Sequence, residues 1–263
     1  MSDSLLVEGA RRLVAAGVQS PRLDARLLLE HSKGDEARFE GFIARRAARE
    51  PLAYITGRRE FWSLDFEVGP GVLIPRPETE TLVEQALAFF PDRAAPLKIL
   101  DLGIGTGCLP VALLKEFPNA RGLGIDRSDE ARAYALRNVA RHGLAERCEI
   151  RGGDWAEATA GPYDVILSNP PYIRTTELAG LAPEVAYEPV LALDGGPDGL
   201  SAYRGLAPVL TRLLSPNGYA FLEIGAGQSA EVGAVLAQSG IHLINLAPDL
   251  AGIPRVFVGG RKT

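Results

Sequence analysis

Apolar side chains in the first fifty residues fall into three groups with roughly helical spacing. Side chains three or four residues apart share one face of an α-helix, so each group predicts a short amphipathic helix. Ser20 followed by Pro21 is typical of a helix start, because serine can cap free N–H groups and proline is tolerated in the first turn. We therefore predict a small helical domain over residues 1–55. The three groups are Leu5, Leu6, Leu13 and Val14; Leu23, Leu27 and Leu28; and Phe39, Phe42 and Ile43.

After Pro51 the pattern changes from helical to strand-like. Residues 61–68 (FWSLDFEV) alternate aromatic or apolar with polar side chains, which is the period of a β-strand. Gly69, Pro70 and Gly71 follow as a turn signal. We predict a β-hairpin over residues 56–76 that links the helical domain to the rest of the chain.

From Pro77 onward, helical and strand patterns alternate, beginning with a predicted helix over 78–89. A second helix is predicted over 128–141, and a further one between the fifth and sixth strands. Strands separated by helices are joined by right-handed crossovers and form a mostly parallel sheet that helices cover on both faces. We therefore predict a doubly wound, seven-stranded α/β domain over residues 77–263. Its strands are expected at 98–101, 122–126, 149–151, 163–168, 219–224, 241–245 and 256–258.

Composition narrows the classes of protein to consider. Apolar residues make up 46% of the 263 residues, which is enough to bury a core. The chain has 28 basic against 33 acidic side chains, whereas nucleic-acid binders usually carry a basic surface that neutralises phosphates. Charged residues interrupt the apolar stretches at 1–18 and 99–114, so neither is typical of a signal peptide or a membrane span. We expect a cytoplasmic monomer that contacts neither membrane nor nucleic acid directly.

Metal-binding side chains do not cluster in the sequence. Cys108 and Cys148 are the only cysteines, and their separation matches neither a disulfide scaffold nor a metal-ligand pair. His31, His142 and His242 are scattered, and we expect them at the surface. We therefore expect reduced thiols and no metal site.

A glycine-rich segment, DLGIGTG over residues 101–107, follows the first strand of the predicted sheet. This places it at the carboxyl edge, where doubly wound folds bind ligands. A dinucleotide loop would need a glycine where Cys108 or Pro110 stands, and no G-K-[ST] of a triphosphate loop follows. The remaining pattern, G-x-G-x-G, is typical of class I methyltransferases, and an ordinary tight turn is the alternative. We predict that S-adenosyl-L-methionine, whose product is S-adenosyl-L-homocysteine, binds at Gly103, Ile104, Gly105, Thr106 and Gly107.

Polar residues after the next two strands extend this predicted cofactor site. Asp126 follows Gly107 by 19 residues and ends the second strand, where a carboxylate can accept hydrogen bonds from both ribose hydroxyls. Asp154 and Trp155 follow the third strand. The indole can stack on adenine, and Asp154 can accept a hydrogen bond from the exocyclic amine. Taken singly, Asp126 could be a solvated loop carboxylate, and Trp155 could be an ordinary core or surface side chain.

The tetrapeptide Asn169-Pro170-Pro171-Tyr172 follows the fourth strand at the same edge. An amide nitrogen is a poor nucleophile because its lone pair is delocalised, so it must be held and desolvated to attack a sulfonium methyl. The Asn169 side-chain oxygen and the Pro170 carbonyl can accept its two hydrogens, while two prolines stiffen the loop. Tyr172 can wall the planar group. We predict Asn169, Pro170 and Tyr172 as catalytic and all four residues as substrate-binding, with no general base; a proline-rich turn is the alternative.

Residues 169–172 resemble the signature of amino methyltransferases that act on planar nitrogens in adenine, cytosine or glutamine. Further segments resemble the release factor glutamine methyltransferases, also called the HemK or PrmC family, and the resemblance covers nearly the whole chain. The 70–80 run is the most specific of them. The segments are 51–57 (PLAYITG), 60–66 (EFWSLDF), 70–80 (PGVLIPRPETE), 169–173 (NPPYI), 188–189 (EP) and 191–199 (LALDGGPDG).

The resemblance implies a substrate: the glutamine of the Gly-Gly-Gln loop of bacterial class 1 peptide chain release factors. It also implies that the helical domain recognises that protein and that Asn169 is cofactor-binding as well as substrate-binding. Two rival functions stay open, a nucleic-acid adenine methyltransferase using the same tetrapeptide on a flipped base, and a non-catalytic cofactor-binding module. The roles of six polar residues are also open between lining the site and ordinary capping or solvation. These are Arg76, Glu78, Glu80, Tyr187, Glu188 and Asp194.

Overall fold

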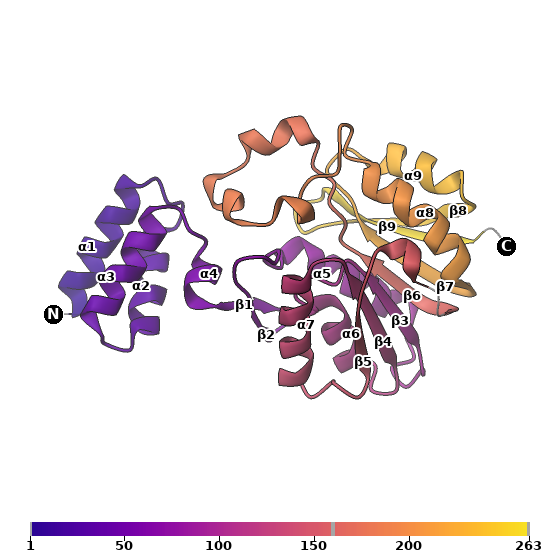
Figure 1. The fold of residues 1–263 in the computed structure, drawn as a ribbon, viewed down its shortest axis with the longest axis horizontal. Helices are drawn as coiled ribbons and strands as arrows, with labels where there is room; N and C mark the ends of the chain where they lie inside the picture. Colours follow the sequence, from indigo (N-terminus) through magenta and orange to yellow (C-terminus); the bar gives the residue numbers. More distant parts are fainter. Residues whose placement is uncertain (1, 159–160, 262–263) are drawn as a thin grey trace.

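The computed structural model describes residues 2–158 and 161–261. Its amino-terminal part is a helical bundle with a core of its own, which includes the fully buried Leu13, Leu28, Phe39 and Ile43. Ser20 directly precedes the second helix, but its side chain makes no capping hydrogen bond. Figure 1 shows this bundle at one end of the molecule. Its helices are α1 (Ser2–Ala15), α2 (Pro21–Ser32), α3 (Glu36–Ala47) and α4 (Leu52–Thr56).

A two-stranded hairpin follows, formed by β1 (Arg58–Phe61) and β2 (Leu64–Glu67). The predicted hairpin is present, but residues 61–68 are not one strand. Trp62 and Ser63 form the turn with φ of 54° and 55°, the backbone that a tight two-residue hairpin turn requires. The Glu60 carboxylate accepts a hydrogen bond from the Ser63 N–H at 2.6 Å. The alternation of apolar and polar residues continues through Trp62 and Ser63, so this alternation alone does not show where the chain reverses direction.

The remaining strands form one seven-stranded sheet in the order β5-β4-β3-β6-β7-β9-β8. Strand β9 is antiparallel to both of its neighbours, and all other neighbouring pairs are parallel. The chain runs outward from β3 to β5 and then returns to β6, so the strand order switches between β3 and β6. In such folds this switch point is where ligands bind. The strands are β3 (Lys98–Leu102), β4 (Arg121–Asp126), β5 (Cys148–Gly152), β6 (Tyr163–Ser168), β7 (Leu214–Glu223), β8 (Ile241–Pro248) and β9 (Pro254–Arg261).

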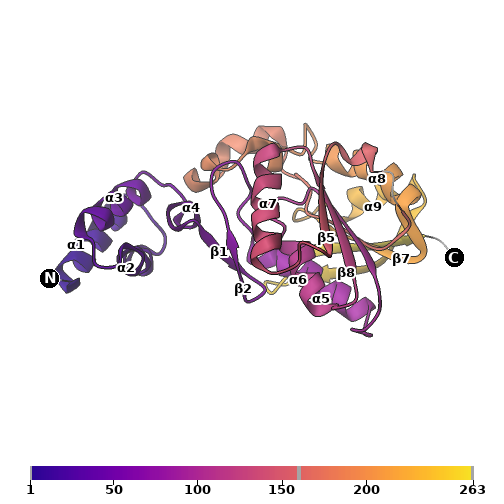
Figure 2. The same ribbon diagram turned by 60° about the horizontal axis from the view of Figure 1, so that its bottom comes forward.

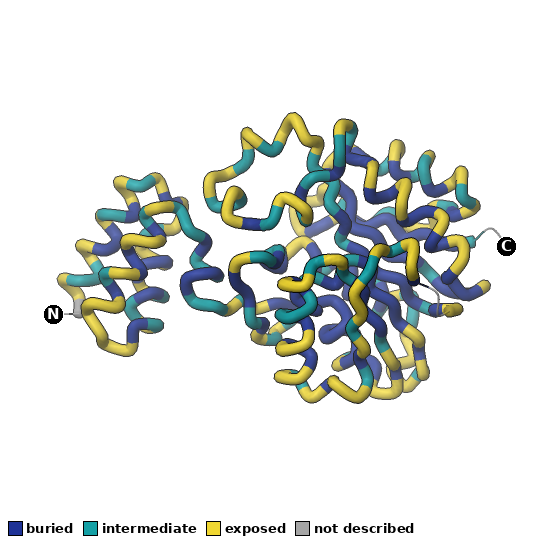
Figure 3. The backbone as a smooth tube through the Cα atoms, in the orientation of Figure 1, coloured by how far each residue is buried: buried dark blue, intermediate teal, exposed yellow. Residues whose placement is uncertain are grey.

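Helices cover both faces of the sheet, as predicted (Figures 1 and 2). Successive residues of β3 face opposite layers: Ile99 packs with α5, α6 and the hairpin, and Leu100 packs with α8 and α9. The central strands β3 and β6 are buried along most of their length, whereas β5 and β8, at the two edges of the sheet, are largely not (Figure 3). Helix α8, which contains Pro208, was not predicted from the sequence. The helices are α5 (Glu80–Phe89), α6 (Cys108–Glu116), α7 (Asp129–Arg141), α8 (Ser201–Leu213) and α9 (Ser229–Ala237).

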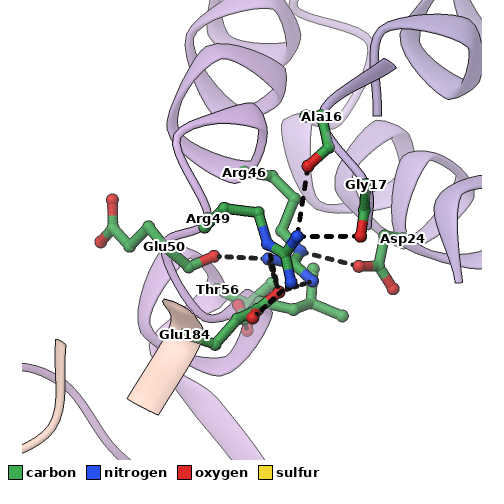
Figure 4. Close-up of polar contacts among 9 residues, drawn as sticks. Ala16, Gly17, Asp24, Arg46, Arg49, Glu50, Thr56 and Glu184 are labelled. Atoms are coloured by element: carbon green, nitrogen blue, oxygen red, sulfur yellow. Dashed lines mark hydrogen bonds and ion pairs between the residues drawn. The ribbon is translucent and has the colours of Figure 1, made fainter. Parts of the chain in front are cut away.

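The long segment between β6 and α8 contains only short 3-10 helices and reaches back to the helical bundle (Figure 1). Figure 4 shows Glu184 of this segment between two arginines of the bundle. Arg46 donates to Glu184 Oε1 at 3.0 Å, and Arg49 donates to Glu184 Oε2 at 2.7 Å. Burial alone would raise the pKa of Glu184, but the two guanidinium groups outweigh it and lower the pKa to about 2. The bundle and this segment are therefore held together electrostatically.

Candidate active site

A cavity of about 330 Å³ opens at the carboxyl edge of the sheet, within the usual size range of ligand pockets. Its wall includes residues that follow four adjacent parallel strands. Because parallel strands end at the same edge, side chains far apart in the sequence meet there. Five residues predicted to bind the cofactor line this cavity: Gly103, Asp126, Asp154, Trp155 and Asn169.

The glycine loop forms the base of this cavity through Gly103. Gly103, Gly105 and Gly107 have φ of 88°, 54° and 80°, the left-handed backbone that glycine adopts without a Cβ clash. The other four predicted loop residues are not among the cavity-lining side chains. Ile104 is 3% exposed and packs against Gly124 of β4. Thr106 is also buried, so these residues support the loop from behind.

Asp126 fixes the loop as well as lining the cavity. Its Oδ2 accepts a hydrogen bond from the Gly105 N–H at 3.0 Å, and its Oδ1 accepts one from the Ser128 N–H at 2.9 Å. Each oxygen keeps a lone pair for a ligand. Asp154 is the N-cap of the 3-10 helix Trp155–Glu157, which places the half-buried Trp155 indole within 3.8 Å of a Cβ built on Gly103. The cavity is therefore narrow between the indole and the loop.

Asn169 lies where the first cavity meets a second one of about 120 Å³. Leu73, Asn169 and Ala192 line both cavities. Pro171 lines the first and Tyr172 the second, whereas Pro170 is buried behind them. The tetrapeptide thus separates two adjoining spaces.

Two polar side chains that were not predicted from the sequence, Thr79 and Glu223, lie near Asn169, and Glu223 also lines the second cavity. Thr79 accepts a hydrogen bond from Asn169 Nδ2 at 3.2 Å and donates one to Glu223 Oε2 at 2.6 Å. Tyr172 donates its phenolic hydrogen to Glu223 Oε1 at 3.2 Å. Burial raises the pKa of both Glu223 and Tyr172 above their ordinary values. The available signal for Glu223 was its position in the predicted strand 219–224, which ends at the same edge of the sheet.

The structure also places the residues whose roles were open. Arg76 lines the second cavity and forms an ion pair with Glu188, which is 4% exposed and also accepts a hydrogen bond from the Ile74 N–H at 3.0 Å. This pair fastens the 70–80 run to the segment after β6. Asp194 lines the first cavity. The others lie outside both cavities: Glu78 is exposed, Glu80 accepts a hydrogen bond from the Trp62 N–H, and Tyr187 donates to the Ala48 carbonyl.

Asp101, near the end of β3, is a further residue that was not predicted from the sequence. It is 1% exposed, and neither carboxylate oxygen has a hydrogen-bond partner among the described residues. Burial, together with the nearby charge of Asp126, raises its pKa well above the ordinary value. A buried carboxyl group without a partner costs stability, so Asp101, two residues before Gly103, is a candidate site residue.

Within residues 2–158 and 161–261, no group of three or more His, Cys, Asp or Glu side chains is arranged to hold a metal ion. His31, His142 and His242 are half-buried rather than fully exposed. Over the same residues, no helix is both long and apolar enough to cross a bilayer.

Known proteins resemble this chain along almost its full length. The family profile "Methyltransferase small domain" matches residues 81–184, and the profile "PrmC N-terminal domain" matches residues 4–57. The release factor glutamine methyltransferase of Rhodospirillum rubrum is 45% identical, covering 98% of this chain and 84% of the relative. That of Caulobacter vibrioides is 42% identical, covering 94% and 92%.

This chain belongs to the release factor glutamine methyltransferase family. The family and the enzyme class expected from sequence are thereby confirmed.

Solved structures resemble the enzyme in fold. A ribosomal protein L11 methylase from Lactobacillus delbrueckii subsp. bulgaricus superposes with a TM-score of 0.55 at 21% identity, covering 74% of this chain and 84% of that one. The catalytic domain of hMettl16, solved in complex with the MAT2A 3′UTR hairpin 6, gives a TM-score of 0.65 at 15% identity, covering 84% and 82%. The predicted fold class is confirmed.

Proposed function

We propose that this enzyme transfers a methyl group from S-adenosyl-L-methionine to the side-chain amide nitrogen of the glutamine in the Gly-Gly-Gln motif of class 1 peptide chain release factors. The observation that carries the proposal is the position of Asn169 between two adjoining cavities. A methyl transfer needs donor and acceptor in adjacent spaces that meet at one point. The larger cavity suits the donor, and the smaller one suits an amide side chain.

The residues of the larger cavity fit S-adenosyl-L-methionine, which supplies an electrophilic methyl group on a positively charged sulfur. Asp126 offers acceptors to the ribose hydroxyls, and the Trp155 indole offers a face to adenine. Asp154, which also lines this cavity, offers an acceptor to the adenine amine. The buried Asp101 carboxyl group has no hydrogen-bond partner among the described residues and would ionise beside a positively charged ligand.

The chain's own residues prepare the acceptor nitrogen. Asn169 Oδ1 and the Pro170 carbonyl accept the two amide hydrogens, which orients the nitrogen toward the methyl donor and reduces its conjugation with the carbonyl. Pro170 and Pro171 have no N–H to compete and restrict the loop backbone. Tyr172 closes one side of the smaller cavity and excludes water. Positioning of this kind contributes roughly 7 to 11 kcal/mol, enough to act without a general base.

The substrate assignment is supported by relatives over 40% identical that are named release factor glutamine methyltransferases. The match of residues 4–57 to a PrmC N-terminal domain agrees with our proposal that residues 1–55 form a recognition domain, 56–76 a linking hairpin and 77–263 the methyltransferase domain. Cytoplasmic location and a monomeric state stay predictions.

Mass spectrometry of the Gly-Gly-Gln peptide tests this function directly. A bacterial class 1 release factor is incubated with the enzyme and S-adenosyl-L-methionine, then digested. We expect a gain of one methyl group on the glutamine. Asn169→Ala is the matched control and should lose about 100-fold or more of the turnover while retaining cofactor binding. Methyl label that appears in DNA or RNA and never in release factor would contradict the proposal, as would full activity of Asn169→Ala.

A further inference from the structure

The proposed chemistry requires the Asn169 side chain to present its oxygen to the substrate. The two ends of a side-chain amide have nearly the same shape, but one accepts hydrogen bonds and the other donates them. If the NH2 end of Asn169 faced the substrate, its N–H groups would point at the N–H groups of the substrate amide. No hydrogen bond would then hold the substrate nitrogen. Something in the protein therefore has to select one orientation of the amide.

A chain of hydrogen bonds makes that selection. Thr79 has a single hydroxyl hydrogen, and its short 2.6 Å contact commits this hydrogen to Glu223 Oε2. Only lone pairs of the hydroxyl remain for Asn169, so the amide must turn its Nδ2 toward Thr79, at 3.2 Å. Among the residues that the structure describes, Asn169 Oδ1 accepts no hydrogen bond, and the side chain lines both cavities.

Glu223 ends this chain as its acceptor and also holds the other functional side chain of the tetrapeptide. It is 1% exposed at the end of β7, and its second oxygen accepts the Tyr172 phenolic hydrogen. The raised pKa of Tyr172 keeps the phenol a donor through the physiological range. Gln228 donates to the Tyr172 carbonyl at 3.0 Å, which fixes the backbone on the same side.

We propose that Glu223 is a positioning residue that acts through Thr79: it fixes the Asn169 amide with its oxygen toward the substrate nitrogen and sets the Tyr172 ring beside it. The proposal rests on the proposed function, since it concerns how that reaction is oriented. Neither Glu223 nor Thr79 needs to touch the reacting atoms.

Thr79→Val and Thr79→Ser form the matched pair that tests this relay. Valine keeps the shape of threonine but removes the hydroxyl, so the amide loses its orientation. We expect kcat to fall about 10- to 100-fold, while KM for the release factor and Kd for S-adenosyl-L-methionine change less than about threefold. Serine keeps the hydroxyl and should restore most of the turnover.

Glu223→Gln tests the end of the relay. The glutamine amide can donate to Thr79, which frees the hydroxyl hydrogen to point at Asn169 and favours the wrong orientation of its amide. We expect a loss of kcat similar to that of Thr79→Val. The Thr79→Val/Glu223→Gln double variant should lose little more kcat than either single variant, because both substitutions interrupt one relay. If the two substitutions damaged the structure independently, their fold losses in kcat would multiply. Thermal unfolding of each variant verifies folding, and the Thr79 pair remains decisive if Glu223→Gln is unstable.

The outcomes separate this inference from the function on which it rests. A wild-type enzyme that never methylates the glutamine rejects the proposed function itself. An active wild type with a fully active Thr79→Val, or with Thr79→Ser as impaired as Thr79→Val, rejects only the relay. Losses that multiply in the double variant would also reject it.

Discussion

Gly124, in the middle of β4, lies directly behind the cofactor loop, and a methyl group added there should deform the loop. A Cβ at this position would lie 1.9 Å from Ile104 Cδ1, 2.8 Å from Cγ1 and 3.0 Å from Cβ. Rotation of the Ile104 side chain can move Cδ1 and Cγ1 but leaves the contact with Cβ, whose position the backbone fixes. Because Ile104 is 3% exposed, it has no free space to enter. In Gly124→Ala the backbone of the glycine loop must therefore shift.

The size of the effect follows from these distances. Bringing Cδ1 to an ordinary carbon–carbon separation of about 3.5 Å requires a displacement of roughly 1.6 Å. Overpacking of a tight core costs about 1 to 3 kcal/mol. If this strain raises the free energy of the cofactor-binding conformation of the loop by the same amount, the affinity for S-adenosyl-L-methionine falls by about 5- to 150-fold.

Isothermal titration calorimetry with S-adenosyl-L-methionine measures this change. Gly122→Ala is the matched control, because it adds the same methyl group two residues earlier on the same strand. There the new Cβ would lie 3.3 Å from Leu114 Cδ1 and 3.6 Å from Cys148 Sγ, which small adjustments relieve. We expect Kd within about twofold of wild type for Gly122→Ala. Equal affinities of Gly124→Ala and wild type, or equal losses in both variants, would refute the reasoning.

Three further predictions concern the cofactor cavity and the contact between the bundle and the segment after β6. Trp155→Ala should weaken cofactor binding by about 5- to 150-fold in calorimetry, the worth of one stacked base, and Trp155→Phe should recover most of it. Asp101→Asn should weaken binding about 10-fold, because asparagine cannot ionise opposite the positively charged cofactor. It should not lower the melting temperature of the free enzyme, because the buried carboxyl group has no hydrogen-bond partner there; lower stability with unchanged affinity would contradict this. The Glu184 carboxylate stabilises the fold above its ordinary pKa of 4.5, and this is lost as pH falls toward about 2. After solvent screening, Glu184→Gln should cost about 1 to 2 kcal/mol in urea unfolding at neutral pH and progressively less below pH 4.5; a cost independent of pH would exclude the mechanism.

Local patterns in the sequence were enough to predict the sheet and the two motifs at its edge. The strand predicted over 163–168 coincides with β6, and the 98–101 strand lies within β3. Strand periodicity and apolar content depend only on neighbouring residues, so they can be recognised without the tertiary structure. The carboxyl-edge position of the glycine loop and of Asn169 followed from the parallel arrangement.

Contacts between distant segments were decided by strand order and register. Ser168 of β6 pairs with Leu222 of β7, so the next residues along both strands, Asn169 and Glu223, emerge side by side. Nothing in the local sequence predicts that β7 neighbours β6 or that this register is adopted. Thr79 enters the same site from a helix start 90 residues before Asn169.

The sequence by itself therefore determined which chemical groups stand at the ends of strands, and from the family resemblance what reaction they serve. Only the tertiary structure decided which groups orient them: the Thr79 and Glu223 relay, the unpaired Asp101 and the Glu184 contact with the bundle. The physical reason is that periodicity and motif chemistry are encoded locally. Hydrogen-bond partners across a fold depend instead on packing that no single segment specifies.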